Sequence, residues 1–270
     1  MSNRIASPIL RHTPRKRFGQ NFLHDESVIS RIVDSINPQP HDHIVEIGPG
    51  KGALTRRLIG KCGRLDTIEI DRDLANYLSL SLQSKHGEQH FDIHCCDVLK
   101  FDFYSISDIP DTLRVIGNLP YNISTPVIFR LLKYSRLIKD MTFMLQLEVV
   151  NRLSAGLGDK NYGRLGIMAQ YHCEVEHLFN VPSAAFTPKP KVSSAIVRLT
   201  PHQSMPCVAT NVECLQDVVR TAFTQRRKTL RNSMKNLVSE EQLEELELDL
   251  SLRPENLSLQ DYVKISNAIS

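Results

Sequence analysis

Four residues that follow an apolar run are suited to chemistry on an amino group of a nucleic-acid base. The run Leu113 to Ile116 leads, after one glycine, into Asn118-Leu119-Pro120-Tyr121. An amino group on a purine ring is a poor nucleophile, because its lone pair is delocalised into the ring. A rigid turn that offers carbonyl oxygens to the N–H bonds, with an aromatic face for the ring, counters this. An Asn-x-Pro-Tyr segment is also an ordinary turn, so other residues must decide.

A glycine-rich segment after the β-branched run 43–47 indicates a nucleotide-like cofactor. Gly48-Pro49-Gly50-Lys51-Gly52-Ala53 fits the G-x-G-x-x-A fingerprint of NAD and FAD proteins. Its glycines let the backbone approach a ligand closely, and the helix expected after them presents free N–H groups. Glu46 before the turn and Pro49 within it instead resemble the first motif of class I S-adenosylmethionine-dependent methyltransferases. The glycine segment alone leaves both cofactors open.

Two acids at the ends of later apolar runs help to decide between a dinucleotide and S-adenosylmethionine as the cofactor. Glu69 lies 21 positions after Gly48, which suits binding of a ribose diol in either family. Asp97 ends the next run, where it is placed to accept a hydrogen bond from an adenine amino group. Asp97 favours the methyltransferase.

The elements that must position these residues alternate between strands and helices. Strands are expected at 43–47, 65–70, 91–96, 113–116, 141–147, 178–181 and 195–199. Helices are expected at 28–36, 53–59, 74–82 with Asp73 as N-cap, 124–132 capped by Ser124, 148–153 and 165–171. This order predicts a doubly wound α/β fold, with a parallel sheet covered on both faces. Ligands of such sheets bind beyond the carboxyl ends of the strands, where Gly48, Glu69, Asp97 and Asn118 all fall.

The chain is expected to form two domains. Residues 1–200 form the cofactor-binding catalytic domain with a basic N-terminal arm, and residues 201–270 form a small helical RNA-binding domain. A linker is expected at 200–211, and only helical patterns follow it, at 215–223, 228–237, 240–246 and 259–269.

Composition excludes several classes of protein. The 270 residues are 41% hydrophobic and 23% charged, as in ordinary globular proteins, and no apolar run is long enough to span a bilayer. No signal-like segment is found, so a cytoplasmic protein is expected. The cysteines show no CxxC or disulfide-framework spacing. His90 and His94 share a strand face without further ligands, so no metal site is expected.

The cations are unevenly distributed. Positions 1–24 hold five cations and no acid, and a second acid-free cluster runs from Arg220 to Lys235. Either run alone is commonly a solvated surface, but two such runs favour a polyanionic partner.

The whole chain resembles the KsgA/RsmA family of small-subunit ribosomal RNA adenine dimethyltransferases. The family's blocks occur in order: 17–23, 45–55, 69–72, 97–98, 118–121, 144–149, 162–165, 186–192 and 223–233. Two residues depart from the family pattern. Lys51 stands where an apolar residue is more common, and Leu147 stands where a lysine is common.

The resemblance implies a Rossmann-like class I methyltransferase and assigns roles to matching residues. For S-adenosylmethionine binding these are Gln20, Asn21, Leu23, Glu46, Gly48, Gly50, Glu69, Ile70, Asp97, Val98 and Asn118. For the target adenine they are Asn118, Leu119, Pro120, Tyr121 and Phe186, with Tyr121 and Phe186 approaching the base from opposite sides. For RNA they are Arg15, Lys16, Arg17, Arg220, Arg226, Arg227, Lys228 and Arg231.

The implied reaction is dimethylation of N6 on two adjacent adenosines in the 3′-terminal hairpin loop of 16S ribosomal RNA. The implied partner is the 30S subunit or its precursor, and a monomer is expected. Two alternatives remain: a large-subunit ribosomal RNA adenine methyltransferase with the same core, and a ribosome-assembly or RNA-binding factor whose catalysis is secondary.

Overall fold

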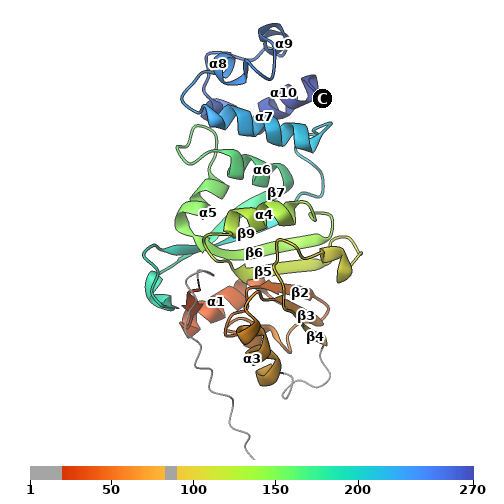
Figure 1. Ribbon diagram of the computed structural model, residues 1–270, viewed down its shortest axis with the longest axis vertical. Coiled ribbons are helices and arrows are strands. Elements are labelled where there is room, and N and C mark those ends of the chain that lie inside the picture. Colours follow the sequence, from red (N-terminus) through yellow and green to blue (C-terminus); the bar gives the residue numbers. More distant parts are fainter. Residues whose placement is uncertain (1–19, 83–89) are drawn as a thin grey trace, which may run out of the picture. The chain divides into compact units, whose positions relative to one another are not determined.

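The computed structural model describes residues 20–82 and 90–270, except the side chain of Glu240. The chain divides into two compact units (Figure 1). The first comprises Met1–Leu147 with Glu176–Thr200, and the second comprises Glu148–Val175 with Pro201–Ser270. The break near residue 200 coincides with the expected linker, but residues 148–175 group with the C-terminal helices. Residues of this segment pack there: the Tyr162 hydroxyl donates to the Leu257 carbonyl at 3.1 Å.

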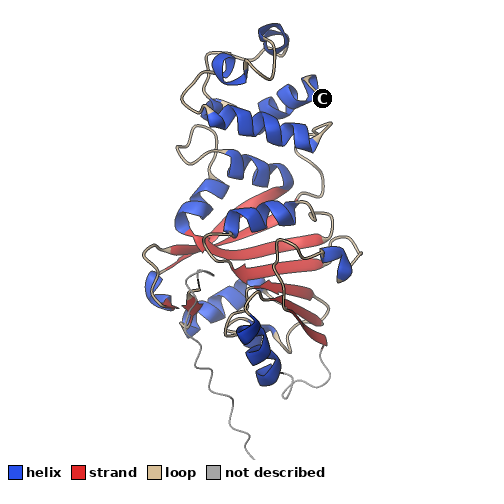
Figure 2. Ribbon diagram, viewed as in Figure 1, coloured by secondary structure: helices blue, strands red, loops and turns tan. Residues whose placement is uncertain are grey.

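The first unit is built on a seven-stranded sheet (Figure 2). Its spatial order is β4 (His90–His94), β3 (Arg64–Ile68), β2 (His43–Ile47), β5 (Leu113–Asn118), β6 (Ile138–Gln146), β9 (Ser194–Pro201) and β7 (Cys173–Val181). The five strands β4, β3, β2, β5 and β6 are parallel to one another, whereas β9 pairs antiparallel with β6. The expected parallel sheet is thus found from β4 to β6, and the prediction is wrong for β9. The chain enters β9 from a short connection at the carboxyl edge and not through a crossover helix, so β9 must run back along β6.

Among the described residues of the first unit, four α-helices connect the strands. They are α1 (Glu26–Ile36), α2 (Thr55–Leu58), α3 (Arg72–Leu82) and α4 (Ser124–Leu132). Two predicted caps are wrong. Asp73 lies inside α3, and its N–H donates to the Asp71 carboxylate at 3.1 Å. Ser124 is the first helical residue of α4, and its hydroxyl donates to the Tyr121 carbonyl at 3.2 Å. An Asp or Ser at the start of a helix leaves the cap uncertain by a residue or two.

A buried arginine joins the amino ends of three strands. From β5, Arg114 donates to the Asp42 carboxylate at 2.6 Å and to Asp140 of β6 at 2.9 Å. A further bond of 2.7 Å reaches the Ile36 carbonyl at the end of α1. The Arg114 side chain therefore links α1, the residue before β2, β5 and β6 within the core.

A two-stranded antiparallel ladder accompanies the main sheet. It pairs β1 (Phe22–Leu23) with β8 (Phe186–Thr187), in the register Phe22 to Thr187 and Leu23 to Phe186. Strands of two residues leave no periodicity in the sequence, so this ladder was not predicted.

The helices of the second unit are α5 (Leu147–Ser154), α6 (Arg164–His172), α7 (Val212–Thr224), α8 (Leu230–Met234), α9 (Glu240–Glu245) and α10 (Leu259–Ala268). Phe223 packs between two tyrosines, with ring centroids 6.4 Å from Tyr162 and 6.2 Å from Tyr262. Helix α8 is shorter than the expected 228–237, because it begins only at Leu230 and residues 235–237 form a turn after it. Across the described ranges, no helix has the length and apolarity needed to cross a membrane.

Candidate functional site

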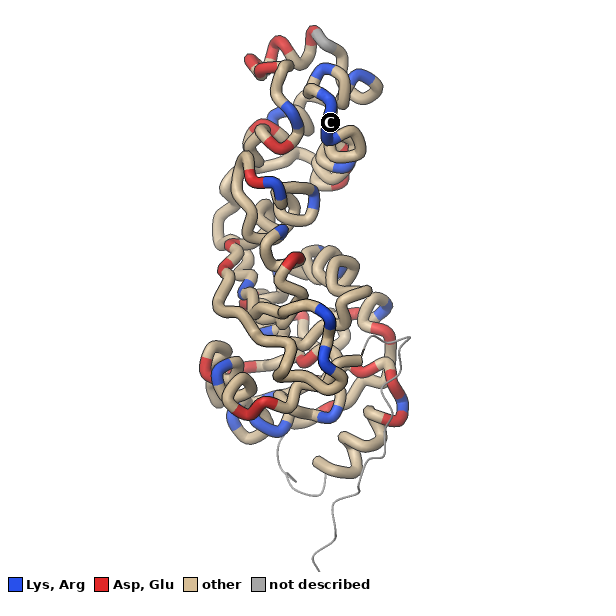
Figure 3. The backbone as a smooth tube through the Cα atoms, turned by 90° about the vertical axis from the view of Figure 1, so that its left-hand side faces the viewer, with Lys and Arg blue, Asp and Glu red and all other residues tan. Residues whose placement is uncertain are grey.

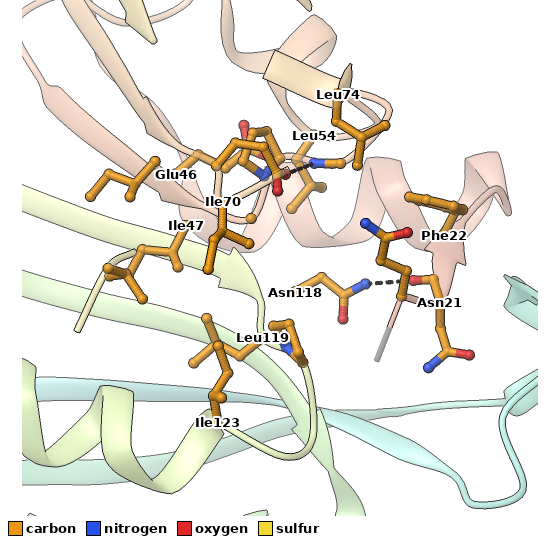
Figure 4. A pocket seen from close by; sticks show the side chains of 18 of the residues that line it. Asn21, Phe22, Glu46, Ile47, Leu54, Ile70, Leu74, Asn118, Leu119 and Ile123 are labelled. Carbon is orange, nitrogen blue, oxygen red and sulfur yellow. Dashed lines mark hydrogen bonds between the residues drawn. The ribbon is translucent and has the colours of Figure 1, made fainter. Parts of the chain in front are cut away.

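A cavity of about 320 Å³ lies within the first unit, at the carboxyl ends of the central strands. Figure 4 shows side chains of β2, β5 and the N-terminal segment around it. Every residue expected to bind the cofactor lines this cavity. So do all four residues of the Asn-Leu-Pro-Tyr turn. Residues from positions 20 to 123 are thus brought to one place, as the parallel strand order predicted.

The glycine turn forms one wall through its backbone. Gly48 and Gly50 have φ of +66° and +59°, a region that favours glycine. The Gly48 N–H donates to the Ile68 carbonyl at 2.9 Å, which joins the turn to β3. A Cβ on Gly50 would meet the Phe22 ring at 3.3 Å, so the small residue also admits the N-terminal segment.

Glu46 is buried beneath this turn. Its Oε2 accepts a hydrogen bond from the Thr55 hydroxyl at 2.7 Å. Burial raises the pKa of Glu46 to about 7, and the neighbouring Glu69 carboxylate adds to the rise. A carboxyl held in this state is predisposed to a ligand that brings positive charge.

Glu69 connects the glycine turn to the start of α3. One carboxylate oxygen accepts from the Gly50 N–H at 3.1 Å and the other from the Asp71 N–H at 2.9 Å. Burial raises the pKa of Glu69, and these two backbone hydrogen bonds oppose the rise. In this structure the carboxylate thus organises the cavity wall.

The side chain of Asn118 is oriented by the N-terminal segment. Its Nδ2 donates to the backbone carbonyl of Asn21 at 3.1 Å, and Figure 4 shows the two residues facing each other. The donor end of the amide is therefore engaged, and Oδ1 is the end available to accept. Leu119 follows in a turn fixed by its N–H bond to the Met144 carbonyl, 3.2 Å long.

Tyr121 is held by hydrogen bonds at its side-chain hydroxyl and at its backbone carbonyl. Its hydroxyl lies 2.8 Å from the hydroxyl of Ser194, which is fully buried at the start of β9. Its carbonyl accepts from Ser124 at 3.2 Å. Ser194 was not identified from the sequence, because only the antiparallel return of β9 brings it beside the turn.

We expect Ser194→Ala to lower kcat/KM of the protein about fivefold, because the variant loses the hydrogen bond that holds Tyr121 and one such bond has this scale. Tyr121→Phe removes the same bond, so the double variant should lose no more than either single variant. Single-turnover kinetics with calorimetric cofactor titrations measure this, and cofactor affinity should stay unchanged. Ser266→Ala, at another fully buried serine, is the matched control. Additive losses in the double variant would contradict the role.

Phe186 is the one predicted target-binding residue that does not line the cavity. Its side chain is 3% exposed and packs in the apolar core with residues of α1. Its place in β8, opposite Leu23 of the cavity wall, makes it a support of the N-terminal segment. Of the predicted pair, only Tyr121 lines the cavity.

In the segment 20–23, Phe22 joins the three predicted residues as a fourth that lines the cavity. The Gln20 side chain donates to the Asp71 carboxylate at 3.1 Å. Lys51, the departure in the glycine turn, places its ammonium 4.7 Å from the centroid of the Phe22 ring. Apolar walls complete the cavity, and they too were not predicted: Ile47, Leu54, Leu74, Leu99 and Ile123.

The predicted RNA-binding cations have different environments. Arg15, Lys16 and Arg17 lie outside the described residues. Arg226 is engaged within the second unit, since it donates to the Lys160 carbonyl at 2.8 Å and lies 3.6 Å from the Glu255 carboxylate. Arg220 pairs with Asp217 on the exposed face of α7 at 2.9 Å. Arg227, Lys228 and Arg231 are exposed. Figure 3 shows that acids are interspersed with cations along both units.

Among the residues that the structure describes, no three His, Cys, Asp or Glu side chains are arranged to hold an ion. His94 instead places Nε2 2.6 Å from the Asp66 carboxylate.

The sheet order, the glycine turn and the acids at the strand ends define a class I methyltransferase fold. The family model described as ribosomal RNA adenine dimethylase matches residues 11–270. The chain therefore belongs to the ribosomal RNA adenine dimethylase family.

Two curated relatives are each named ribosomal RNA small subunit methyltransferase A. The protein of Saccharophagus degradans is 54% identical over 269 residues, covering 100% of this chain and 99% of the relative. The protein of Marinobacter nauticus is 55% identical over 260 residues, covering 96% and 92%.

Two solved structures share the fold. A dimethyladenosine transferase from Plasmodium falciparum is 28% identical with a TM-score of 0.78, over 90% of this chain and 95% of the other. The 23S rRNA methyltransferase ErmE is 25% identical with a TM-score of 0.70, over 92% and 99%.

Proposed function

We propose that the protein transfers methyl groups from S-adenosylmethionine to N6 of two adjacent adenosines in the 3′-terminal hairpin loop of 16S ribosomal RNA, dimethylating both. One observation carries the proposal: the glycine turn and the Asn-Leu-Pro-Tyr turn line the same cavity. The names of the relatives, at 54–55% identity over nearly the full chain, support the small subunit as the source of the RNA. The weaker similarity to ErmE supports only the shared core.

The residues present fit S-adenosylmethionine. The buried Glu46 carboxyl offers a partner for the ammonium group of its methionine part. Glu69 suits the ribose diol, and Asp97 and Val98 suit the adenine. Apolar side chains such as Leu54 and Leu74 exclude water from the ligand.

When bound, the cofactor would supply a methyl group on a positively charged sulfur; the sulfur would keep the electron pair of the broken C–S bond, and the methylated N6, formed as a cation, would release its proton to solvent. The protein therefore has no strong base to provide, and its contribution is positioning and electrostatics. Asn118 Oδ1 and the Leu119 carbonyl accept hydrogen bonds from adenine N6, which localises the nitrogen lone pair. Tyr121 stacks on the extruded base, an interaction worth on the order of 1–3 kcal/mol.

The partner in this proposal is 16S RNA within the 30S subunit or its precursor, met in the cytoplasm by a monomeric enzyme. The exposed cations of the second unit, Arg227, Lys228 and Arg231, contribute phosphate contacts. The basic residues Arg15, Lys16 and Arg17 would act in the same way.

The experiment that tests the proposal uses purified protein, labelled S-adenosylmethionine and small subunits lacking the modification. Mapping should place label on two adjacent adenosines of the 3′-terminal hairpin, and large subunits should remain unlabelled. Label only on large-subunit RNA would favour the alternative methyltransferase, and no transfer to either would overturn the proposal.

Cofactor affinity should rise with pH through the region where Glu46 ionises. With a pKa of about 7, the free protein carries a protonated Glu46 below that pH, and binding a cation must first expel this proton. Affinity should therefore increase severalfold between about pH 6 and 7.5, with proton release. The stability of the free protein should change with pH in the opposite direction. Because the pKa of Glu46 is raised in the folded state, the free energy of unfolding falls as pH rises from about 4.3 to 7.

Calorimetry in two buffers of different ionisation enthalpy measures both the affinity and the released proton. Glu46→Gln is the control, because it keeps the shape of the side chain and removes its titration. Equal pH dependence in the wild type and in this variant would contradict the assignment.

A further inference from the structure

A lysine-bearing connection begins beside the cavity wall and ends beside the Asn-Leu-Pro-Tyr turn. It joins β8 to β9 and has the sequence Pro188-Lys189-Pro190-Lys191-Val192-Ser193. At its start, Thr187 pairs with Phe22, a residue of the cavity wall. At its end, Ser194 lies 2.8 Å from the Tyr121 hydroxyl. Both anchors belong to the first unit, so this connection is fixed at the rim of the cavity.

The two lysines flank a buried residue of this connection. Lys189 and Lys191 are exposed, whereas Pro190 between them is buried. Burial of Pro190 anchors the connection between the two exposed lysines, and the chain bends at Lys191 and Val192. Two prolines restrict the backbone, and the Ser193 carbonyl accepts from the Leu147 N–H at 3.0 Å. The lysines are thus presented on a restrained edge.

The charge of this edge is not neutralised locally. No acidic residue occurs between Phe186 and Arg198. Within the described residues, neither Lys189 nor Lys191 forms an ion pair. Val192, 45% exposed, adds an apolar surface beside them. An edge with two free cations and one apolar side chain matches the phosphates and sugar of a polynucleotide.

The distance to the target base follows from the chain itself. Two residues lie between Lys191 and Ser194, so three Cα-to-Cα steps join them and their Cα atoms lie within about 11 Å. Tyr121, in contact with Ser194, is the residue on which the base would stack. A base that leaves its stack remains joined to its neighbours, so its flanking phosphates must pass the rim of the cavity.

We infer that Lys189 and Lys191 form a phosphate-binding edge that holds the nucleotides flanking the target adenosine. This inference rests on the proposed function and adds a second RNA contact, on the catalytic unit itself. The edge positions the strand and carries no sequence information, since lysine contacts phosphates as a point charge.

The test compares binding of unmethylated small subunits by the wild type and by Lys189→Ala/Lys191→Ala. Titrations are made in a series of KCl concentrations at constant Mg²⁺, with S-adenosylhomocysteine present. Loss of two single-strand phosphate contacts should reduce the slope of log affinity against log salt by about 1.4 and weaken binding roughly tenfold at low salt. Lys189→Arg/Lys191→Arg should keep the wild-type slope.

The matched control is Lys61→Ala/Lys133→Ala. Both lysines are exposed and lie in turns that precede the amino ends of β3 and β6, at the edge of the sheet away from the cavity. This variant should bind within about twofold of wild type. An unchanged slope and affinity in Lys189→Ala/Lys191→Ala would overturn the inference, and so would an equal loss in the control.

Failure of the proposed function gives a different result. In that case the wild type itself neither binds nor methylates the subunits, and the inference falls with it. If the wild type methylates the subunits and only the phosphate edge is wrong, Lys189→Ala/Lys191→Ala keeps the salt slope and the methylation rate of the wild type, which rejects the edge. Calorimetry should show that cofactor affinity is the same in all these proteins.

Discussion

Asn118→Ala should transfer methyl groups at least a hundredfold more slowly than the wild type while still folding and binding cofactor. The expected cause is loss of the Asn118 Oδ1 acceptor. In the wild type, Nδ2 donates to the Asn21 carbonyl, and this bond turns Oδ1 away from Asn21. Removing a hydrogen-bond partner of a transition state costs about 10²–10³ in rate. Single-turnover methylation of unmethylated small subunits measures the chemical step, and calorimetry measures cofactor affinity separately.

Two further variants at this turn separate orientation from chemistry. Asn122→Ala is the matched control, since Asn122 also lines the cavity but is exposed and lies beyond the turn's acceptors. It should retain nearly full activity. Asn118→Asp keeps an acceptor but replaces the donor by an oxygen that the Asn21 carbonyl repels, so it should be slow despite its similar shape. Near wild-type turnover of Asn118→Ala would refute the role.

Arg114→Ala should lower the free energy of unfolding by about 3–5 kcal/mol at pH 7, the cost of breaking a buried ion pair from one side. It leaves two buried acids, Asp42 and Asp140, and the Ile36 carbonyl without their common donor. Although burial raises the pKa of Asp42, hydrogen bonds from the Gln39 N–H and Arg114 hold it below its ordinary value. Asp42 therefore stabilises the wild type above about pH 4 and loses this effect on acidification.

Urea denaturation followed by circular dichroism measures the loss. Lys139→Ala is the matched control, because the Lys139 ammonium lies 3.9 Å from the same Asp42 carboxylate but is half-exposed. Its effect should stay below about 1 kcal/mol. The deficit of Arg114→Ala should shrink in acid, where the orphaned carboxylates are protonated. A loss as small as that of Lys139→Ala would show that the buried network contributes little to stability.

The amino-acid sequence was sufficient to predict most strands of the first unit and many of the residues that line its cavity. β-Branched runs such as His43–Ile47 matched their strands, because a fully buried parallel strand needs continuous apolar residues. The Gly48 and Asn118 turns could be placed together because parallel strands end at one edge. These predictions depend on local patterns and on one rule of topology.

Contacts between distant segments could not be predicted. The β1–β8 ladder, the Ser194–Tyr121 bond, the burial of Phe186 and the Arg114 network each join residues far apart in the chain. The antiparallel return of β9 and the grouping of residues 148–175 with the C-terminal helices are of the same kind. Local periodicity records which face of an element is apolar, but it does not record which partner covers that face. Only the packed tertiary structure selects the partner, and with it the orientation of the Asn118 amide and the lysine edge beside Tyr121.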